Sequence, residues 1–303
     1  MMIYRAAVSG RYFAGCSRKA GSRLFSAWYL VRTMSSHLTE ASLTGGTENA
    51  RAADTEHPAA SVGLSPTPEL LAELAARAKE FETHQPEQIL QWAVARFAPR
   101  FSMATAFGPE GMCLLHWLGE FAPETPVFNL DTGYQFPETL ELRERVRQRY
   151  GIEVELKRPQ HSVQEYETLH GGPLYQTDPS RCCHDRKIKL LEEAAQGIDA
   201  WASAIRRDQS ADRAQAAIVG WDQRFQLVKV NPLANWTKQQ VWKLITDCDI
   251  PYNPLHDRGY TSIGCQPCTR AVLPGEDERA GRWSGFAKVE CGLHSLTDDS
   301  QSH

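Results

Sequence analysis

The chain of 303 residues lacks any apolar run that approaches the roughly 20 residues needed to span a bilayer. It also lacks a large excess of charge of either sign, because 33 basic and 37 acidic residues leave a net charge of −4. These two absences argue against a membrane protein and against bulk binding to nucleic acid or a membrane surface. With 42% hydrophobic and 23% charged residues, the composition is that of a globular protein with one large domain or two small ones.

Acidic residues are also missing from the N-terminal stretch before Glu40, which instead contains Arg5, Arg11, Arg18, Lys19, Arg23 and Arg32. A basic, acid-poor start is typical of transit peptides, but no clear amphipathic helix accompanies it here. We therefore favour a translation start assigned too early, with Met34 as the true start. Because 45–66 are small and polar, we expect residues 1–64 to form a disordered or wrongly included extension.

Between 65 and 285, strand-like and helix-like segments alternate. Strands are predicted at Val127–Leu130, at Ile152–Leu156, and within "RFSMATAFGPEG" and "IDAWASAIRRDQS". A helix is expected after Thr67, and Thr237 with Gln240 forms a candidate capping box for another. The alternation predicts an α/β fold in which helices flank a parallel, twisted sheet.

Three loops, "ATAFGPEG", "LDTGYQ" and "IRRDQS", follow predicted strands. Ligands bind beyond the carboxyl ends of the strands in such sheets. The loops offer backbone amides, a threonine hydroxyl and two guanidinium groups, which suit a nucleotide with an anionic group. The first loop is not a Walker A loop, because it lacks the Gly-Lys-Ser/Thr ending.

No cleavable secretory signal is evident, so we expect a reducing compartment, in which clustered cysteines indicate metal binding or catalysis. The chain has eight cysteines: Cys16, Cys113, Cys182, Cys183, Cys248, Cys265, Cys268 and Cys291. The two-residue spacer of Cys265 and Cys268 allows both thiolates to reach one metal centre. Adjacent side chains on a helix diverge by about 100°, so Cys182 and Cys183 favour a multi-iron cluster. Zinc remains open on ligand number, as do a redox dithiol at "CQPC" and core cysteines at "CC".

A further cysteine, Cys291, lies in "VECGLHS" with His294 three residues later, and the chain beyond is mostly polar. A cysteine on such a tail is either incidental or a nucleophile that has to move. Cys113 and Cys248 lie in apolar helical contexts and are expected to be small buried residues.

Six ordered motifs then suggest a family: "LDTGYQFPETLELRERV", "CCHDRK", "AIRRDQSADRA", "VNPLANWTKQQVW", "IPYNPLHDRGYTSIGCQPCTRAV" and "ERAGRWSGFAKVECGLH". Together they resemble the assimilatory sulfonucleotide reductases from roughly residue 65 to 295. The two cysteine pairs are similar to those of the iron–sulfur branch, which uses adenosine 5′-phosphosulfate. The resemblance implies a Rossmann-like sheet of the adenine nucleotide α-hydrolase type and a [4Fe-4S] cluster on Cys182, Cys183, Cys265 and Cys268.

The resemblance also implies an activity, namely reduction of adenosine 5′-phosphosulfate to sulfite and AMP in sulfate assimilation and cysteine biosynthesis. Thioredoxin or glutaredoxin would be the reductant, a separate protein because no redoxin-like domain is appended. It implies a cytoplasmic enzyme that binds neither nucleic acid nor membrane, and it leaves a homo-oligomer open.

The site residues that the resemblance implies fall into three groups. Cys291 matches the family's nucleophile, on a mobile C-terminal segment at 286–303. The residues that fall where the family binds the phosphosulfate are Lys187, Arg206, Arg207, Arg279, Arg282 and His294. Thr105 and Leu130 fall in the nucleotide loops.

One departure bears on the substrate. The loop Thr105-Ala106-Phe107-Gly108 is nearer to the Ser-Phe-Gly form of the branch that uses the 3′-phosphorylated nucleotide. A reductase of 3′-phosphoadenylylsulfate, or of both nucleotides, is therefore the first alternative. More distant ones are an iron–sulfur tRNA sulfurtransferase of the same fold, which should have an intact ATP loop, and a zinc-binding nucleic-acid module, which should be basic.

Overall fold

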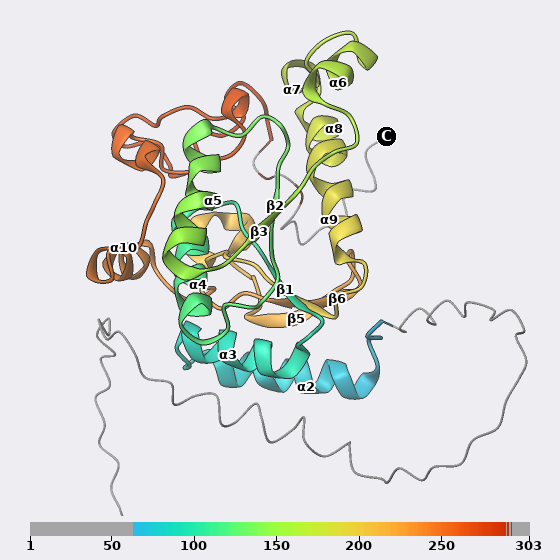
Figure 1. Ribbon diagram of the computed structural model, residues 1–303, viewed down its shortest axis with the longest axis vertical. Helices are drawn as coiled ribbons and strands as arrows, with labels where there is room; N and C mark the ends of the chain where they lie inside the picture. Colours follow the sequence, from blue (N-terminus) through green and yellow to red (C-terminus); the bar gives the residue numbers. More distant parts are fainter. Residues whose placement is uncertain (1–62, 289, 291, 293–303) are drawn as a thin grey trace, which may run out of the picture. The chain divides into compact units, whose positions relative to one another are not determined.

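The structure is a computed structural model that describes residues 63–288, 290 and 292, and all structural statements concern these residues. Its centre is a six-stranded sheet with the order β3-β2-β1-β4-β6-β5 (Figure 1). The strands are β1 Phe101–Ala104, β2 Val127–Leu130, β3 Val154–Lys157, β4 Ala200–Ala202, β5 Val219–Asp222 and β6 Leu227–Val230. Neighbouring strands are parallel except β5 and β6, which are antiparallel. The predicted α/β fold is therefore confirmed.

The chain changes direction across the sheet at β1. β1 pairs with β2 on one side, with Met103 opposite Val127, and with β4 on the other, with Met103 opposite Ala202. The strands β2 and β3 follow β1 on one side of it, whereas β4 and the later strands lie on the other side. The topological switch point therefore lies at the carboxyl ends of β1 and β4. Ligands bind at such a point in open α/β sheets, because the connections there diverge to opposite faces.

Helices cover both faces of the sheet, with α4 and α5 on one side and α9 on the other (Figure 1). The α-helices are α2 Pro68–Phe81, α3 Pro86–Phe97, α4 Pro109–Phe121, α5 Pro137–Tyr150, α6 Val163–Leu169, α7 Leu174–Thr177, α8 Pro179–Cys183, α9 Lys189–Ala195 and α10 Lys238–Asp247. A π-helix, η1 His184–Ile188, joins α8 to α9, and short 3₁₀ turns are η2 Arg207–Gln209, η3 Ala211–Arg213, η4 Pro254–Arg258 and η5 Gln266–Cys268. No helix among the described residues is long and apolar enough to cross a membrane.

Local sequence signals explain several element ends. The Thr67 hydroxyl accepts a hydrogen bond from the Leu70 amide at the start of α2, and the capping box of Thr237 and Gln240 opens α10. Both predicted caps are thus confirmed. The predicted strand Ile152–Leu156 begins instead at Val154, because Gly151 ends α5 with φ of 69° and the next two residues complete the turn.

The core fixes the elements that surround the switch point. Helix α4 is buried along its centre from Glu110 to Leu118. On the opposite face, Leu191 of α9 packs in a cluster with Phe128 of β2 and Trp201 of β4. Close packing of this kind leaves little freedom for α9, and through it for the preceding π-helix.

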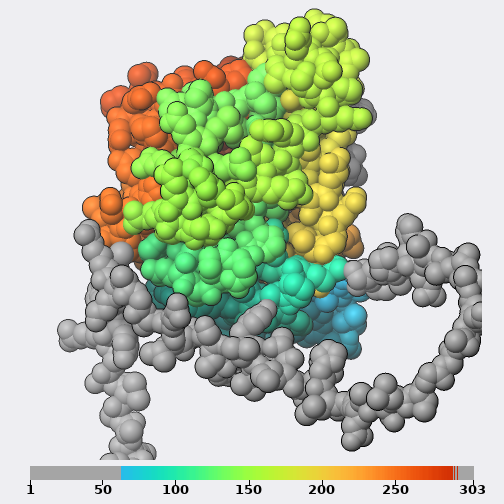
Figure 2. Space-filling view, in the orientation of Figure 1, coloured from blue at the N-terminus to red at the C-terminus, as the bar shows by residue number. Residues whose placement is uncertain are grey.

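The middle of the chain also contacts the segment after α10. Arg145 and Arg149 of α5 donate hydrogen bonds to the Tyr252 and Cys248 carbonyls at 3.4 and 2.7 Å. The space-filling view shows the green middle of the chain beside the orange C-terminal part on this face (Figure 2).

The expected domain boundaries stay predictions. The extension 1–64 lies outside the described residues except for Gly63 and Leu64, and the Leu64 amide donates to Asp199 Oδ1 at 3.2 Å. The expected C-terminal segment 286–303 is described only at 286–288, 290 and 292, so Cys291 and His294 lie outside the described residues.

Candidate functional site

A cavity of about 430 Å³ opens at the switch point. Its wall combines the carboxyl ends of β1 and β4, the first turn of α4, part of α10 and the loops from His256 to Arg282. Cavities of roughly 300–1,000 Å³ hold small molecules and cofactors, so this one can accept a nucleotide.

The loop after β1 forms one side of this cavity. The Thr105 hydroxyl accepts a hydrogen bond from the Phe107 amide at 3.0 Å, and Phe107 takes the left-handed φ of 56°. A Cβ at Gly111 would lie 2.8 Å from Thr105 Oγ1, so glycine is needed for the loop to fold onto α4. The N-terminus of α4 therefore faces the cavity, where its amides and dipole favour an anion.

The end of β2 forms the next side. Asn129 donates from Nδ2 to the Thr105 carbonyl at 2.7 Å, which ties the two strand ends together. Gln135 donates from Nε2 to Asn129 Oδ1 and to the Leu130 carbonyl, each at 3.0 Å. Thr105 and Leu130, both predicted in the nucleotide loops, line the cavity.

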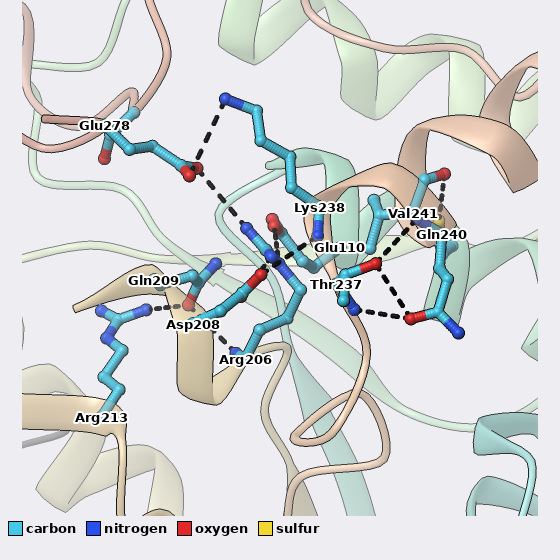
Figure 3. A network of polar contacts seen from close by, with 12 residues as sticks. Glu110, Arg206, Asp208, Gln209, Arg213, Thr237, Lys238, Gln240, Val241 and Glu278 are labelled. Carbon is cyan, nitrogen blue, oxygen red and sulfur yellow. Dashed lines mark hydrogen bonds and ion pairs between the residues drawn. The ribbon is translucent and has the colours of Figure 1, made fainter. Parts of the chain in front are cut away.

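The two arginines of the "IRRDQS" loop do not line the cavity. The Arg206 side chain is fully buried, and its guanidinium contacts Glu110 at 2.7 Å, Asp208, and Glu278 at 3.5 Å (Figure 3). Burial raises the pKa of Glu278, whereas the charges of Lys238 and Arg206 oppose that rise. Arg206 thus holds together three carboxylates from distant parts of the chain.

Arg207 turns away from the cavity toward the N-terminal helices. It binds both carboxylate oxygens of Glu82 at 2.7 and 2.8 Å and donates from Nε to the Ala216 carbonyl at 2.8 Å. The hydrogen bond from Arg207 lowers the pKa of Glu82 despite partial burial. The structure therefore does not bring the guanidinium groups of these two arginines together with the other predicted phosphosulfate ligands.

Three other predicted cations do line the cavity, namely Lys187, Arg279 and Arg282. The Arg282 guanidinium lies 4.4 Å from the centre of the Trp283 ring and 3.4 Å, through Nη1, from Ser262 Oγ. A Cβ at Gly264 would collide with Arg282 Nη2, so glycine there lets Arg282 reach the wall. Lys187 and Arg282 both act on the Cys265 thiol and so lie near it, in a wall that also contains Glu110, Glu278 and Glu290.

The four candidate metal ligands surround a second, smaller cavity. Cys182 and Cys183 come from the end of α8, Cys265 precedes η5, and Cys268 ends η5. Thr132 Oγ1 lies 3.3 Å from Cys265 Sγ. The family resemblance implied that the two cysteine pairs belong to one centre, and the structure places all four around one space.

The chemistry of this donor set fits an iron–sulfur cluster. Burial and the neighbouring sulfur atoms raise the pKa of Cys182 to about 12 and that of Cys268 to about 11, so the four thiolates would repel one another without a metal. Among the described residues, no three His, Cys, Asp or Glu side chains are arranged to hold a single metal ion. Four thiols around one space are a complete ligand set for an all-cysteine cluster, and equally for structural zinc.

The two cavities share a wall. Lys187, Cys265 and Arg282 line both of them. Lys187 reaches this position from the π-helix, and Arg282 from the loop that follows η5. The charge of Lys187, the hydroxyl of Thr132 and the charge of Arg282 lower the pKa of Cys265, although burial acts in the opposite direction. The four thiols therefore lie next to the cations Lys187 and Arg282 of the large cavity.

Comparison with known proteins agrees with this arrangement. The family model described as the phosphoadenosine phosphosulfate reductase domain matches residues 100–271. The chain belongs to the phosphoadenosine phosphosulfate reductase family. The resemblance inferred from the six motifs is thereby confirmed. Family membership lends no support to the tRNA sulfurtransferase or to the zinc-binding nucleic-acid module.

Relatives within the reductase family cover most of the chain. A phosphoadenosine 5′-phosphosulfate reductase of Gloeobacter violaceus is 45% identical over 221 residues, which are 72% of this chain and 92% of the relative. An adenosine 5′-phosphosulfate reductase of Salinibacter ruber is 42% identical over 227 residues, which are 75% of this chain and 90% of the relative. The crystal structure of a Candida auris phosphoadenylyl-sulfate reductase in a phosphate complex matches with a TM-score of 0.60 and 27% identity, and covers 70% of this chain and 100% of that chain.

Sequence reasoning missed several polar residues that line the cavity of this family member: Gln209, Arg213, Lys238, Glu278 and Glu290. Arg213 and Glu290 lie within motifs that carried the family resemblance, which was the available signal. Their positions depend on the tertiary structure: Arg213, on η3, lines the cavity, whereas Arg207, on η2, pairs with Glu82.

Proposed function

We propose that this protein is an iron–sulfur sulfonucleotide reductase, which reduces adenosine 5′-phosphosulfate to sulfite and AMP with electrons from thioredoxin or glutaredoxin. The names of the relatives, which are phosphosulfate reductases, support the reaction, and we place the activity in sulfate assimilation toward cysteine. The observation that carries the proposal is the wall that the nucleotide-sized cavity shares with the four-cysteine cavity through Lys187 and Arg282. A reducing cytoplasm is the matching compartment, since it keeps the cysteines as thiols.

The cavity accounts for both ends of such a substrate. The loop after β1, with Thr105 and the α4 N-terminus, and the Leu130 loop after β2 would hold the nucleotide. Lys187, Arg279 and Arg282 would meet the phosphosulfate, because clustered cations bind oxyanions through short, charge-assisted hydrogen bonds. His294 keeps its proposed place beside the sulfate, whereas Arg206 and Arg207 would act indirectly by fixing the loop between β4 and β5.

The proposed chemistry begins at Cys291. Its thiolate attacks the sulfur of the phosphosulfate, an S–S bond forms, and the S–O bond to AMP breaks with its electron pair on AMP. A free cysteine has a pKa near about 8.5, and neighbouring cations lower it toward neutrality. The same cations stabilise the charge that develops as AMP leaves.

The second stage needs a dithiol protein. A thioredoxin thiolate attacks the Cys291 sulfur and expels sulfite, and the second thioredoxin thiol then resolves the mixed disulfide. Two electrons pass from the dithiol to the transferred sulfonate. Because Cys291 has to serve first the cavity and then a partner protein, its location near the end of the chain suits the reaction.

Cys182, Cys183, Cys265 and Cys268 would hold the [4Fe-4S] cluster. When bound, it would supply fixed charge and rigidity beside Lys187 rather than electrons. Accumulation of a reduced cluster during turnover would contradict this role.

A second substrate has one observation in its favour. The loop Thr105-Ala106-Phe107-Gly108 is nearer to the form of the 3′-phosphorylated branch, and the Gloeobacter violaceus relative bears the name of that activity. We propose adenosine 5′-phosphosulfate as the preferred substrate. Comparison of kcat/KM for the two nucleotides decides between them, and a higher value for 3′-phosphoadenylylsulfate would reverse the assignment.

The test of the function is sulfite release by anaerobically purified protein supplied with nucleotide and thioredoxin. The wild type should release sulfite, whereas Cys291→Ser should bind AMP, keep its visible absorption and release none. Cys16→Ser is the control, because Cys16 lies outside the six motifs whereas Cys291 lies within the last of them, and it should behave as the wild type. Sulfite release by Cys291→Ser would refute the proposed nucleophile.

A further inference from the structure

We propose that Glu290 is a positioning residue for the nucleophile, an inference that rests on the proposed function. Its carboxylate is held between Arg213 and Arg279 in the wall of the nucleotide cavity. Through this contact, the residue directly before Cys291 is fixed where the reaction takes place.

The contacts of Glu290 are those of an enclosed ion pair. The Glu290 side chain is 6% exposed and that of Arg213 is 9% exposed. Arg213 approaches Glu290 Oε2 through Nε at 2.9 Å and Nη2 at 2.8 Å, while Arg279 Nη2 lies 3.2 Å from Glu290 Oε1. Arg213 is itself oriented by Gln209, whose Oε1 accepts from Nη1 at 2.6 Å. All four residues line the large cavity.

Because Glu290 is bonded directly to Cys291, the contacts of Glu290 also restrict the nucleophile. Consecutive Cα atoms lie about 3.8 Å apart across a trans peptide, so the Cys291 backbone has to stay next to Glu290. A second contact lies on the other side of Cys291, because Arg224 Nη1 donates to the Gly292 carbonyl at 3.1 Å. Both neighbours of the nucleophile in the chain are therefore fastened by arginine side chains.

The last described residues, from Lys288 on, are held by contacts of side chains. No helix or strand is assigned to the described residues after η5. Besides the contacts of Glu290 and Gly292, Lys288 Nζ approaches Ser180 Oγ at 3.3 Å. Loss of the Glu290 carboxylate would therefore remove the principal buried contact of this stretch and leave two cations in the wall.

The experiment measures the first chemical step alone. Wild-type holoenzyme and Glu290→Gln are mixed with adenosine 5′-phosphosulfate without reductant, and the gain of one SO₃ on Cys291 is followed by mass spectrometry. A loss of register of about 1 Å can slow a reaction by about 100-fold, so transfer should slow by one to two orders of magnitude. The AMP dissociation constant and the visible absorption should stay as in the wild type.

Two variants serve as controls. Glu276→Gln breaks a similar pair, in which Arg270 binds both Glu276 oxygens at 2.8 and 2.9 Å away from the cavity, and it should transfer SO₃ at the wild-type rate. Glu290→Asp keeps the charge but shortens the side chain by one methylene, so its rate should lie between those of the wild type and Glu290→Gln. A rate for Glu290→Asp below that of Glu290→Gln would contradict the role of the ion pairs.

Transfer by Glu290→Gln at the wild-type rate would overturn the inference, and so would a joint loss of transfer and AMP binding, which would make Glu290 a structural residue. If Glu290→Gln fails to fold, Arg213→Gln is judged by the same two measurements. Failure of the wild type to gain SO₃ would instead refute the proposed function itself.

Discussion

Arg206 and Arg207 in the loop after β4, and Arg279 and Arg282 after η5, are all predicted substrate ligands, yet the structure uses the two pairs differently. Arg206 is enclosed by carboxylates, and Arg207 is bound to Glu82 at the surface. Arg279 and Arg282 instead line the nucleotide cavity, and Arg282 also borders the four cysteines. Residue type alone therefore does not decide whether an arginine supports the fold or borders the site. Variants of the two loops should separate stability from activity.

The largest effect is expected for Arg206→Met. Removal of one partner from a buried ion pair leaves uncompensated charge, here on Glu110 and its neighbours, and costs about 3–5 kcal/mol of the free energy of unfolding. Urea denaturation followed by circular dichroism measures the change. A surface ion pair contributes about 0–1 kcal/mol. A free energy of unfolding within about 1 kcal/mol of the wild-type value would therefore show that Arg206 does not stabilise the fold as a buried ion pair.

Arg282→Gln should show the opposite pattern. Loss of one cation at the transferring group is expected to lower kcat/KM by about 100-fold, as for other groups that stabilise developing charge. Urea denaturation should show little change in stability. Arg258→Gln provides the control, since Arg258 pairs with Glu138 outside the cavity, at 3.1 Å, and should retain activity. Equal activities of the two variants would remove Arg282 from the site.

The buried His116 makes the stability of the fold depend on pH. Burial, and secondarily the charge of Arg149, lower the pKa of His116 from 6.5 to about 4. The unfolded chain therefore binds a proton between pH 6.5 and 4 that the folded chain does not, so stability falls as the pH drops through this window. The loss between pH 7 and 4.5 should be smaller by about 1–2 kcal/mol in His116→Gln than in the wild type. Urea denaturation at both pH values makes the comparison, and parallel losses would contradict it.

The smallest effect is expected for Arg207→Gln. Its bidentate pair with Glu82 is largely solvent-exposed, so its loss should cost about 0–1 kcal/mol. Sulfite release should be unchanged, because the guanidinium does not line the cavity. A marked loss of activity would return Arg207 to the phosphosulfate site, where the family resemblance first placed it.

The fold and part of the site could be predicted because their signals are local. Local patterns predicted the strands β1 to β4, although not β5 and β6. Because ligands bind beyond the carboxyl ends of strands, the loops with Thr105 and Leu130 were expected at the cavity. The family resemblance implied the convergence of the two cysteine pairs, which are far apart in the chain. The burial of Arg206 in an ion pair could not be predicted from local signals. It depends on Glu110, 96 residues earlier in the chain, lying next to it in the folded protein. The inward turn of Arg213 likewise depends on two 3₁₀ turns that carry no strong sequence signal.

The π-helix between α8 and α9 has a consequence for the length of this stretch of chain. A residue inserted or deleted in a helix rotates everything beyond it by about 100° about the axis. Cys182 and Cys183 precede η1, whereas Leu190 and Leu191, which are buried against the rest of the molecule, follow it. Deletion of one residue from His184–Ile188 would thus put the thiols and the leucines out of phase, so that only one set could face its partners. The residue count of this turn is therefore fixed by two surfaces at once.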